Sequence, residues 1–167
     1  LLASHHAEGD ETWGLDHGAW TVLKFLYPNA DVPVFQVSID MTKGLDYQLE
    51  IGQTLSELRD RGVLILGSGN IVHNLGAVNW RPNSKPHDFA LEFDALFTEK
   101  LTDRDFTALA DRAGLGHLLT AAHPTLDHYL PALTIAGASD ARDDLTYMTD
   151  SIDLGSISMR SFVFHTV

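Results

Sequence analysis

A strand–helix–strand pattern in the first half of the chain constrains its fold more than any other feature. Residues 32–39 (VPVFQVSI) are β-branched and aromatic and predict a buried strand, while residues 47–61 carry apolar side chains at helical spacing. A second apolar run, 63–66 (VLIL), follows directly. Two strands joined by a helix in this way run parallel, so we expect an α/β fold.

The rest of the sequence predicts further helices and one closing strand. Asp16 is placed to cap a helix at 19–27, and Pro131 suits the first turn of a helix within 124–138. Apolar stripes predict helices around 89–97 and 106–113, the second ending at Gly114 and Gly116, and alternation predicts a strand at 157–163. We find no repeat or domain boundary and expect a single domain over residues 1–167.

Composition excludes several classes of protein. The 167 residues contain no cysteine, so disulfides, thiolate metal sites and cysteine nucleophiles are excluded, and a cytoplasmic location is expected. The net charge is -12, and the 11 basic residues are scattered, which disfavours nucleic-acid binding. No apolar run approaches the ~20 residues of a membrane span, so we expect no membrane partner.

Two histidines stand at positions that favour chemistry. His73 lies in the loop that follows the second predicted strand, where parallel sheets place ligands, and it is flanked by Asn70 and Asn74. A structural histidine bonded to a backbone carbonyl explains this position equally well. His17 opens a helix, whose positive N-terminal end favours a neutral imidazole that can act as a base. A histidine that packs in the capping turn is the alternative.

The remaining motifs are weaker. His123 and His128 are five residues apart, which is not the i, i+4 spacing of two ligands on one continuous helix, and Pro124 places His123 before the helix. The segment 67–69 (GSG) lacks the flanking glycine of a serine-hydrolase elbow and of a dinucleotide loop. The pair Asp143 and Asp144 is expected to be a solvated turn.

Several motifs together resemble one family. They occur in a fixed order along the whole chain, and their combination is far more specific than any single one. The chain resembles the DOPA-dioxygenase-type branch of the LigB-like extradiol dioxygenases at residues 14–20 (GLDHGAW), 27–28 (YP), 31–34 (DVPV), 36–39 (QVSI), 67–75 (GSGNIVHNL), 123–131 (HPTLDHYLP) and 155–160 (GSISMR).

The resemblance implies a fold, a metal and a reaction. The fold is α/β, with a central mixed, partly parallel sheet flanked by helices. A divalent metal, Fe(II) or Zn(II), is held mainly by histidines, and His73 and His128 match ligands while His17 matches the acid–base residue. The implied reaction opens a catechol-type, DOPA-like ring with O2. Asn74, His123 and Tyr129 are weaker candidates for contacts with substrate or support of the ligands.

The resemblance also implies two further histidine ligands in an N-terminal region. Their motifs, H-G-S-P and S-A-H-W, do not occur here, and His5 and His6 do not match them. We therefore expect the C-terminal part of a catalytic domain, without the first strands of its sheet. Two alternatives remain open: a non-enzymatic or inactive interaction protein with this fold, and a zinc-dependent hydrolase. The oligomeric state is not predicted.

Overall fold

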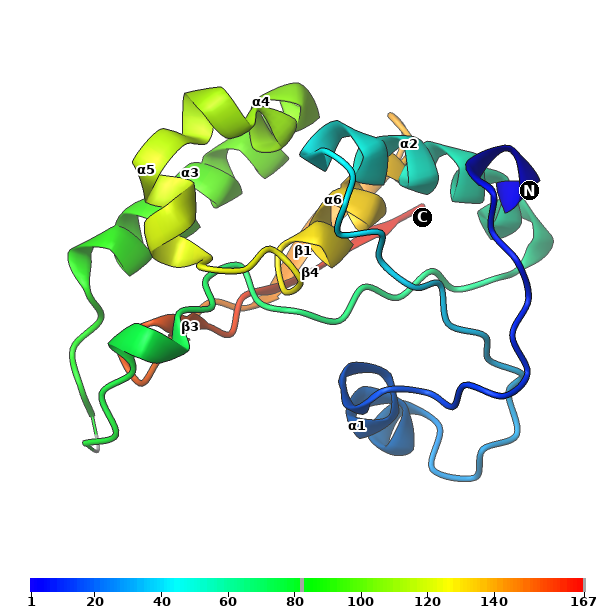
Figure 1. Cartoon of the computed structure of the whole chain (residues 1–167), viewed down its shortest axis with the longest axis horizontal. Coiled ribbons are helices and arrows are strands. Elements are labelled where there is room, and N and C mark those ends of the chain that lie inside the picture. The colour runs from blue at the N-terminus through cyan, green and yellow to red at the C-terminus, as the bar shows by residue number, and fades with distance from the viewer. Residues whose placement is uncertain (82, 167) are drawn as a thin grey trace.

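The chain folds into short helices over two small β ladders, as Figure 1 shows. The computed structural model describes residues 1–81 and 83–166. The elements are η1 (Leu2–His5), α1 (His17–Leu26), α2 (Leu45–Leu55), η2 (Ser56–Arg61), η3 (Leu75–Ala77), α3 (Asp88–Thr102), α4 (Phe106–Ala110), α5 (Arg112–Ala122), α6 (Leu130–Gly137), β1 (Asp144–Thr149), β2 (Ile152–Asp153), β3 (Ile157–Ser158) and β4 (Ser161–His165), where η denotes a 3-10 helix.

The core lies among helices α2 to α6. Helix α2 packs on α6, and α3 packs on α4 and α5. The α2–α6 contact is close because Gly52 and Gly137 face backbone of the opposite helix, and a Cβ atom at either position would overlap a carbonyl oxygen. The largest fully buried apolar side chains come from α3, α4, α6 and the turn before α6, and they are Phe93, Phe97, Leu101, Leu109, Tyr129, Leu130 and Leu133.

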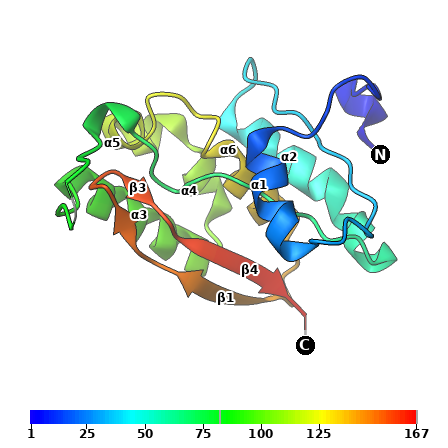
Figure 2. The same ribbon diagram turned by 90° about the horizontal axis from the view of Figure 1, so that it is seen from below.

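Both β ladders are antiparallel. Strand β1 pairs with β4, with Tyr147 opposite Phe162, and β2 pairs with β3. Figure 2 shows the β1–β4 ribbon lying along one side of the helices. Phe162 packs against Phe97 of α3, with ring centroids 5.9 Å apart, so the ribbon covers the core with its apolar face.

The predicted parallel strands are not found among the described residues. Neither 32–39 nor 63–66 forms a ladder, and the central mixed, partly parallel sheet expected from the sequence is absent from this part of the chain. A strand requires a neighbour that accepts and donates its backbone hydrogen bonds, and within residues 1–81 and 83–166 these runs have none. Their apolar side chains are accordingly exposed, with Phe35 at 67% and Leu64 at 61%.

The structure confirms most of the predicted helix ends. Asp16 caps α1, its Oδ1 accepting from the Ala19 amide at 2.9 Å. The predicted helix 47–61 is α2 followed by η2, ended by Gly62 at φ 77°, and Pro131 lies in the first turn of α6. The predicted helix 106–113 corresponds to α4 and the start of α5, and helical geometry is interrupted at Gly116, whose φ is 53°, as predicted; the break at Asp111 and the further helical segment to Ala122 were not predicted.

Near the C-terminus, two further predictions need correction. The predicted strand 157–163 is split into β3 and β4. Asp143 is not solvated: it is 5% exposed and pairs with Arg59 at 2.6 Å and 2.7 Å. Asp144 opens β1, a strand that the sequence did not suggest. Within residues 1–81 and 83–166, no helix combines the length and apolar character of a membrane span.

Candidate functional site

His73 is held by backbone pairing on both sides. Its amide donates to Ala122 at 3.0 Å, and His73 forms an antiparallel bridge with Ile157 of β3. One residue earlier, the Val72 carbonyl accepts from Ser158 at 2.9 Å. The segment 70–74 is therefore fixed between β3 and the loop that leads to α6, and this loop carries His128.

His73 and His128 are brought together in space. Their rings stack face to face, with centroids 3.5 Å apart and planes 9° from parallel. The Nδ1 of His128 lies 3.1 Å from Asn70 Oδ1, whereas no hydrogen bond to the His73 ring is found in the described part of the chain. His128 is thus fixed by a side-chain partner, while stacking is the main constraint on the His73 ring.

The stacked rings do not point at a common centre. A metal ion bound to an imidazole nitrogen lies near the plane of that ring, and two parallel planes about 3.5 Å apart share no such point. For both histidines to bind one ion, one ring has to turn. The His73 ring is the freer of the two, because Asn70 fixes only His128.

His17 is the exposed first residue of α1. Two contacts fix the start of α1. The Asp16 backbone amide donates to Gln36 Oε1 at 3.0 Å while Gln36 Nε2 donates to Asp16 Oδ2 at 3.1 Å, and Ser68 Oγ donates to the Gly18 carbonyl at 2.7 Å. The second contact ties α1 to the loop that carries His73. Burial and then positive charge on His73 lower the pKa of His128, and positive charge on His17 acts more weakly in the same direction.

His123 lies behind the pair, in the core. It is 2% exposed, its Nε2 is 2.7 Å from the Ile71 carbonyl, and its Nδ1 is buried with no partner among the described residues. Since a carbonyl only accepts, Nε2 carries the proton and Nδ1 presents a lone pair. Burial lowers the pKa of His123 to about 4, and positive charge on His73 or His128 acts in the same direction.

Tyr129 and Asn74 have structural partners. The Tyr129 side chain is fully buried, and its hydroxyl donates to the Leu109 carbonyl at 2.9 Å. Burial raises the pKa of this phenol. The Asn74 amide donates to Ala121 at 2.7 Å, and its oxygen accepts from Ala77 at 3.2 Å, capping η3. Neither side chain presents a free polar group to the His73–His128 pair.

The chemistry of these donors suits a divalent metal, although the described residues assemble only part of a ligand set. Burial lowers the pKa of His128, so this imidazole is neutral at pH 7 and has a lone pair to donate. A neighbouring carboxylate, Asp127, is held ionised because a hydrogen bond from Thr125 lowers its pKa. Within residues 1–81 and 83–166, however, no group of three or more His, Cys, Asp or Glu side chains is arranged to hold an ion.

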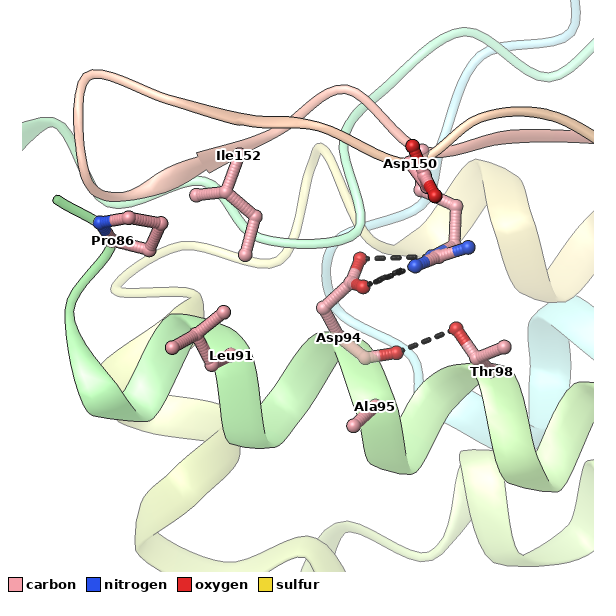
Figure 3. A pocket seen from close by; sticks show the side chains of 8 residues that line it. Pro86, Leu91, Asp94, Ala95, Thr98, Asp150 and Ile152 are labelled. Carbon is pink, nitrogen blue, oxygen red and sulfur yellow. Dashed lines mark hydrogen bonds and ion pairs between the residues drawn. The ribbon is translucent and has the colours of Figure 1, made fainter. Parts of the chain in front are cut away.

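A surface hollow of about 600 Å³ lies elsewhere, between α3 and the β strands. Figure 3 shows Asp94 and Thr98 of α3 facing Asp150 and Ile152 across it. Its principal charges satisfy each other: Arg160 pairs with Asp94 at 2.6 Å and 3.0 Å, and both are largely buried. The hollow contains no histidine among its lining residues, so it is not the candidate site.

The sequence did not predict the hydrogen-bond partners of two polar residues near the histidines, Asn70 and Gln36. Asn70 was considered as a partner of His73, but the structure places its amide on His128. Gln36 lies in a predicted strand and yet orders the start of α1. The only sequence signal for Asn70 is that it is a polar residue shortly after the apolar run 63–66. This signal does not tell which histidine is its partner.

The comparisons with known proteins identify the family. The model of the family described as the catalytic LigB subunit of aromatic ring-opening dioxygenase matches residues 4–155. The chain belongs to the LigB family. Curated LigB relatives include 4,5-DOPA dioxygenase extradiol from Escherichia coli K12, which is 39% identical and matches 90% of this chain, and a protein of the same name from Beta vulgaris, which is 32% identical and matches 93%.

A solved structure agrees with this membership. The crystal structure of an uncharacterized protein from Escherichia coli K12 superposes with a TM-score of 0.83 at 38% identity, over 92% of this chain and 64% of that chain. This LigB chain spans 56% and 58% of the two curated relatives' lengths. The expected membership of the LigB-like family is thus confirmed, and helices combined with small antiparallel ladders are what the described residues show of its fold.

Proposed function

We propose that this chain forms part of the active site of an extradiol dioxygenase that opens catechol-type, DOPA-like rings with O2. The observation that carries the proposal is the stacking of His73 on His128 from two separate segments, with α1, which begins at His17, tied by Ser68 to the loop that carries His73. Membership of the LigB family and similarity to two proteins named 4,5-DOPA dioxygenase extradiol support it.

In this proposal, His128 and His73 hold a divalent metal, Fe(II) for catalysis or Zn(II) in its place. Bound Fe(II) would supply electron transfer between a chelated catechol and O2. His128 is ready to bind as it stands, because its ring is neutral at pH 7. His73 binds after its ring turns out of the stack. On the family's pattern, the other ligands belong to a region with no counterpart in these 167 residues.

His17 is the proposed acid–base residue. It is the first residue of α1, and a neutral imidazole can accept a proton from a catechol hydroxyl. The exposed side chain is open to a substrate arriving from solvent, and the Ser68 contact keeps α1 beside the metal-binding histidines. His123 supports the pair from behind by packing against Tyr129 and bonding the strand-like segment at Ile71.

The test is the metal content of the purified chain, measured by elemental analysis alongside His73→Ala, His128→Ala and, as a matched control, His117→Ala. His117 is exposed on α5 and lies outside the site. We expect bound Fe or Zn that the first two substitutions abolish and the control retains, and O2 uptake that depends on DOPA or catechol.

Other results would support other functions. Metal bound at these histidines without catechol-dependent O2 uptake would favour a zinc-dependent hydrolase. Absence of metal, even after incubation with Fe(II) or Zn(II), would refute the metal role of this chain on its own. It would favour an inactive or interaction protein, in agreement with the incomplete ligand set among the described residues.

A further inference from the structure

The side chain of Asn70 lies between β3 and the His128 ring. Its Nδ2 donates to the Ser158 carbonyl at 2.8 Å, and its Oδ1 lies 3.1 Å from Nδ1 of His128. A backbone carbonyl oxygen only accepts hydrogen bonds, so the amide nitrogen of Asn70 has to face Ser158. The orientation of the amide is thereby fixed, and its oxygen faces the imidazole.

This orientation determines which nitrogen of His128 carries the proton. The amide oxygen also only accepts, so in the neutral ring Nδ1 is the protonated nitrogen and Nε2 keeps its lone pair. The nearest charged group to Nε2 is the Asp127 carboxylate at 3.6 Å, which is too long for a hydrogen bond. Within the described part of the chain, no hydrogen bond engages the lone pair.

We infer that Asn70 is a positioning residue that selects the Nδ1-protonated tautomer of His128 and so presents Nε2 as the metal-binding atom. The identification of Nε2 as a ligand rests on the proposed function, whereas the choice of tautomer does not. A hydrogen-bond acceptor on the second nitrogen fixes the plane of a ligating imidazole and makes it a better donor. Asn70 supplies this acceptor.

The position of Asn70 is itself secured on two sides. Its backbone amide donates to the His128 carbonyl at 3.1 Å, and the preceding Gly69 lies so close to His128 that a Cβ atom there would overlap the same carbonyl. On the other side, Ser158 Oγ donates to Asp94 at 2.7 Å. Asp94 is held by its buried ion pair with Arg160 (Figure 3). The ion pair therefore supports, through β3, the amide that orients His128.

Long-range ¹H–¹⁵N correlation spectra of the metal-free, histidine-labelled chain at pH 7.5 test the inference directly. In the unsubstituted chain, we expect His128 to show a protonated Nδ1 and an unprotonated Nε2. In Asn70→Ala, both nitrogens should move toward intermediate shifts as the tautomers mix. A hydrogen bond worth about 1 kcal/mol corresponds to roughly a fivefold change in the tautomer ratio. Asn70→Asp keeps an acceptor for Nδ1 but loses the Nδ2 donor to the Ser158 carbonyl, so it should restore the original pattern only in part.

Asn74→Ala is the matched control. It removes an asparagine from the same loop whose side chain bonds the backbone groups of Ala121 and Ala77. The tautomer of His128 should not change. A titration with Zn(II) alone, followed by calorimetry, gives the second measurement: Asn70→Ala should weaken binding about 10- to 100-fold, as loss of such supporting groups does elsewhere, and Asn70→Asp should recover part of it.

The outcomes separate the two proposals. A protonated Nε2 in the unsubstituted chain would overturn the role of Asn70, even if metal binds, and this measurement does not depend on any variant folding. An unchanged tautomer in Asn70→Ala would overturn it as well. A chain that binds no Zn(II) but shows the expected change of tautomer would refute the proposed metal site and uphold the positioning of His128 by Asn70.

Discussion

The imidazole rings of His73 and His128 lie face to face, with centroids 3.5 Å apart and planes only 9° from parallel. This arrangement suits two neutral rings, because two imidazolium ions at this distance would repel each other strongly. Burial and the charge of His73 both lower the pKa of His128, which keeps at least one ring neutral near pH 7. The stack has to open before lone pairs from both rings can meet at one ion.

The first prediction is that metal binding breaks this stack. Addition of Zn(II) should remove the mutual ring-current shifts of the His73 and His128 ring protons, and the His73 resonances should move most because only His128 is held by Asn70. Proton NMR during a Zn(II) titration measures this, with the exposed His117 as an internal control. Stoichiometric binding that leaves the His73 shifts unchanged would mean that His73 is not a ligand.

The second prediction concerns His17. His17→Gln should depress catechol-dependent O2 uptake about 100-fold or more, because general acid–base catalysis typically contributes ~10²–10⁴ in rate. Metal content should stay within about twofold of the parent, since His17 is placed on α1 and is not one of the stacked rings. Parallel assays of metal content and O2 uptake check this. Equal loss of metal and activity would instead assign His17 to the ligands.

The third prediction concerns the pH dependence of stability. The folded protein lowers the pKa of His123 from its ordinary 6.5 to about 4. Below pH 6.5, His123 binds a proton in the unfolded chain but not in the folded chain. The contribution of His123 to stability is therefore complete above pH 6.5 and is lost progressively as the pH falls toward 4. Between pH 7.5 and pH 5, the loss amounts to about 2 kcal/mol in the free energy of unfolding.

Urea unfolding of the parent and of His123→Leu at both pH values isolates this effect. The substitution removes the titrating group, so its free energy of unfolding should fall by about 2 kcal/mol less than that of the parent over the same interval. Carboxylates such as Asp143 titrate in both proteins and cancel in the difference. Identical pH dependence in the two proteins would show that His123 is protonated as easily in the folded state as in the unfolded one.

Local signals in the sequence predicted most of the helices. Asp16 as a cap, Gly62 as a stop and Pro131 in a first turn each act within a few residues, and each was confirmed. The interruption at Gly116 was predicted, but the further helical segment to Ala122 was not, because it depends on burial of Leu118 and Leu119 in the core. Tertiary packing decided the length of this helix.

The partners of the site residues were harder to predict. The sequence placed His73 after a buried run and pointed to His128, yet their stacking depends on the pairing of segment 70–74 with β3 and of Asn70 with His128. These contacts join residues more than 50 positions apart, and no local pattern encodes them. Likewise, Tyr129 was a candidate for substrate contact, and only the structure shows its hydroxyl bonded to Leu109 inside the core.

The predicted strands at 32–39 and 63–66 show the limit of local pattern most clearly. Both runs have strand-like composition, but a strand is stable only when a neighbouring strand satisfies its backbone groups. In the described part of the chain no such neighbour exists, and the side chains of Val34, Phe35, Leu64 and Leu66 are exposed. Composition therefore predicted that these segments tend to be extended, but it did not predict whether they pair with a neighbouring strand.

The fourth prediction follows from these two exposed segments: the purified chain should associate in a concentration-dependent manner. Unpaired backbone beside exposed apolar side chains is a site for edge-to-edge pairing. The net charge of -12 opposes association, so 0.5 M NaCl should strengthen it by screening the repulsion. Phe35→Lys and Leu64→Lys should each reduce association, whereas Trp80→Lys, at an equally exposed apolar residue in another loop, should not. Light scattering coupled to size-exclusion chromatography measures this, and a monomer at every concentration and salt level would show that these segments are protected in solution.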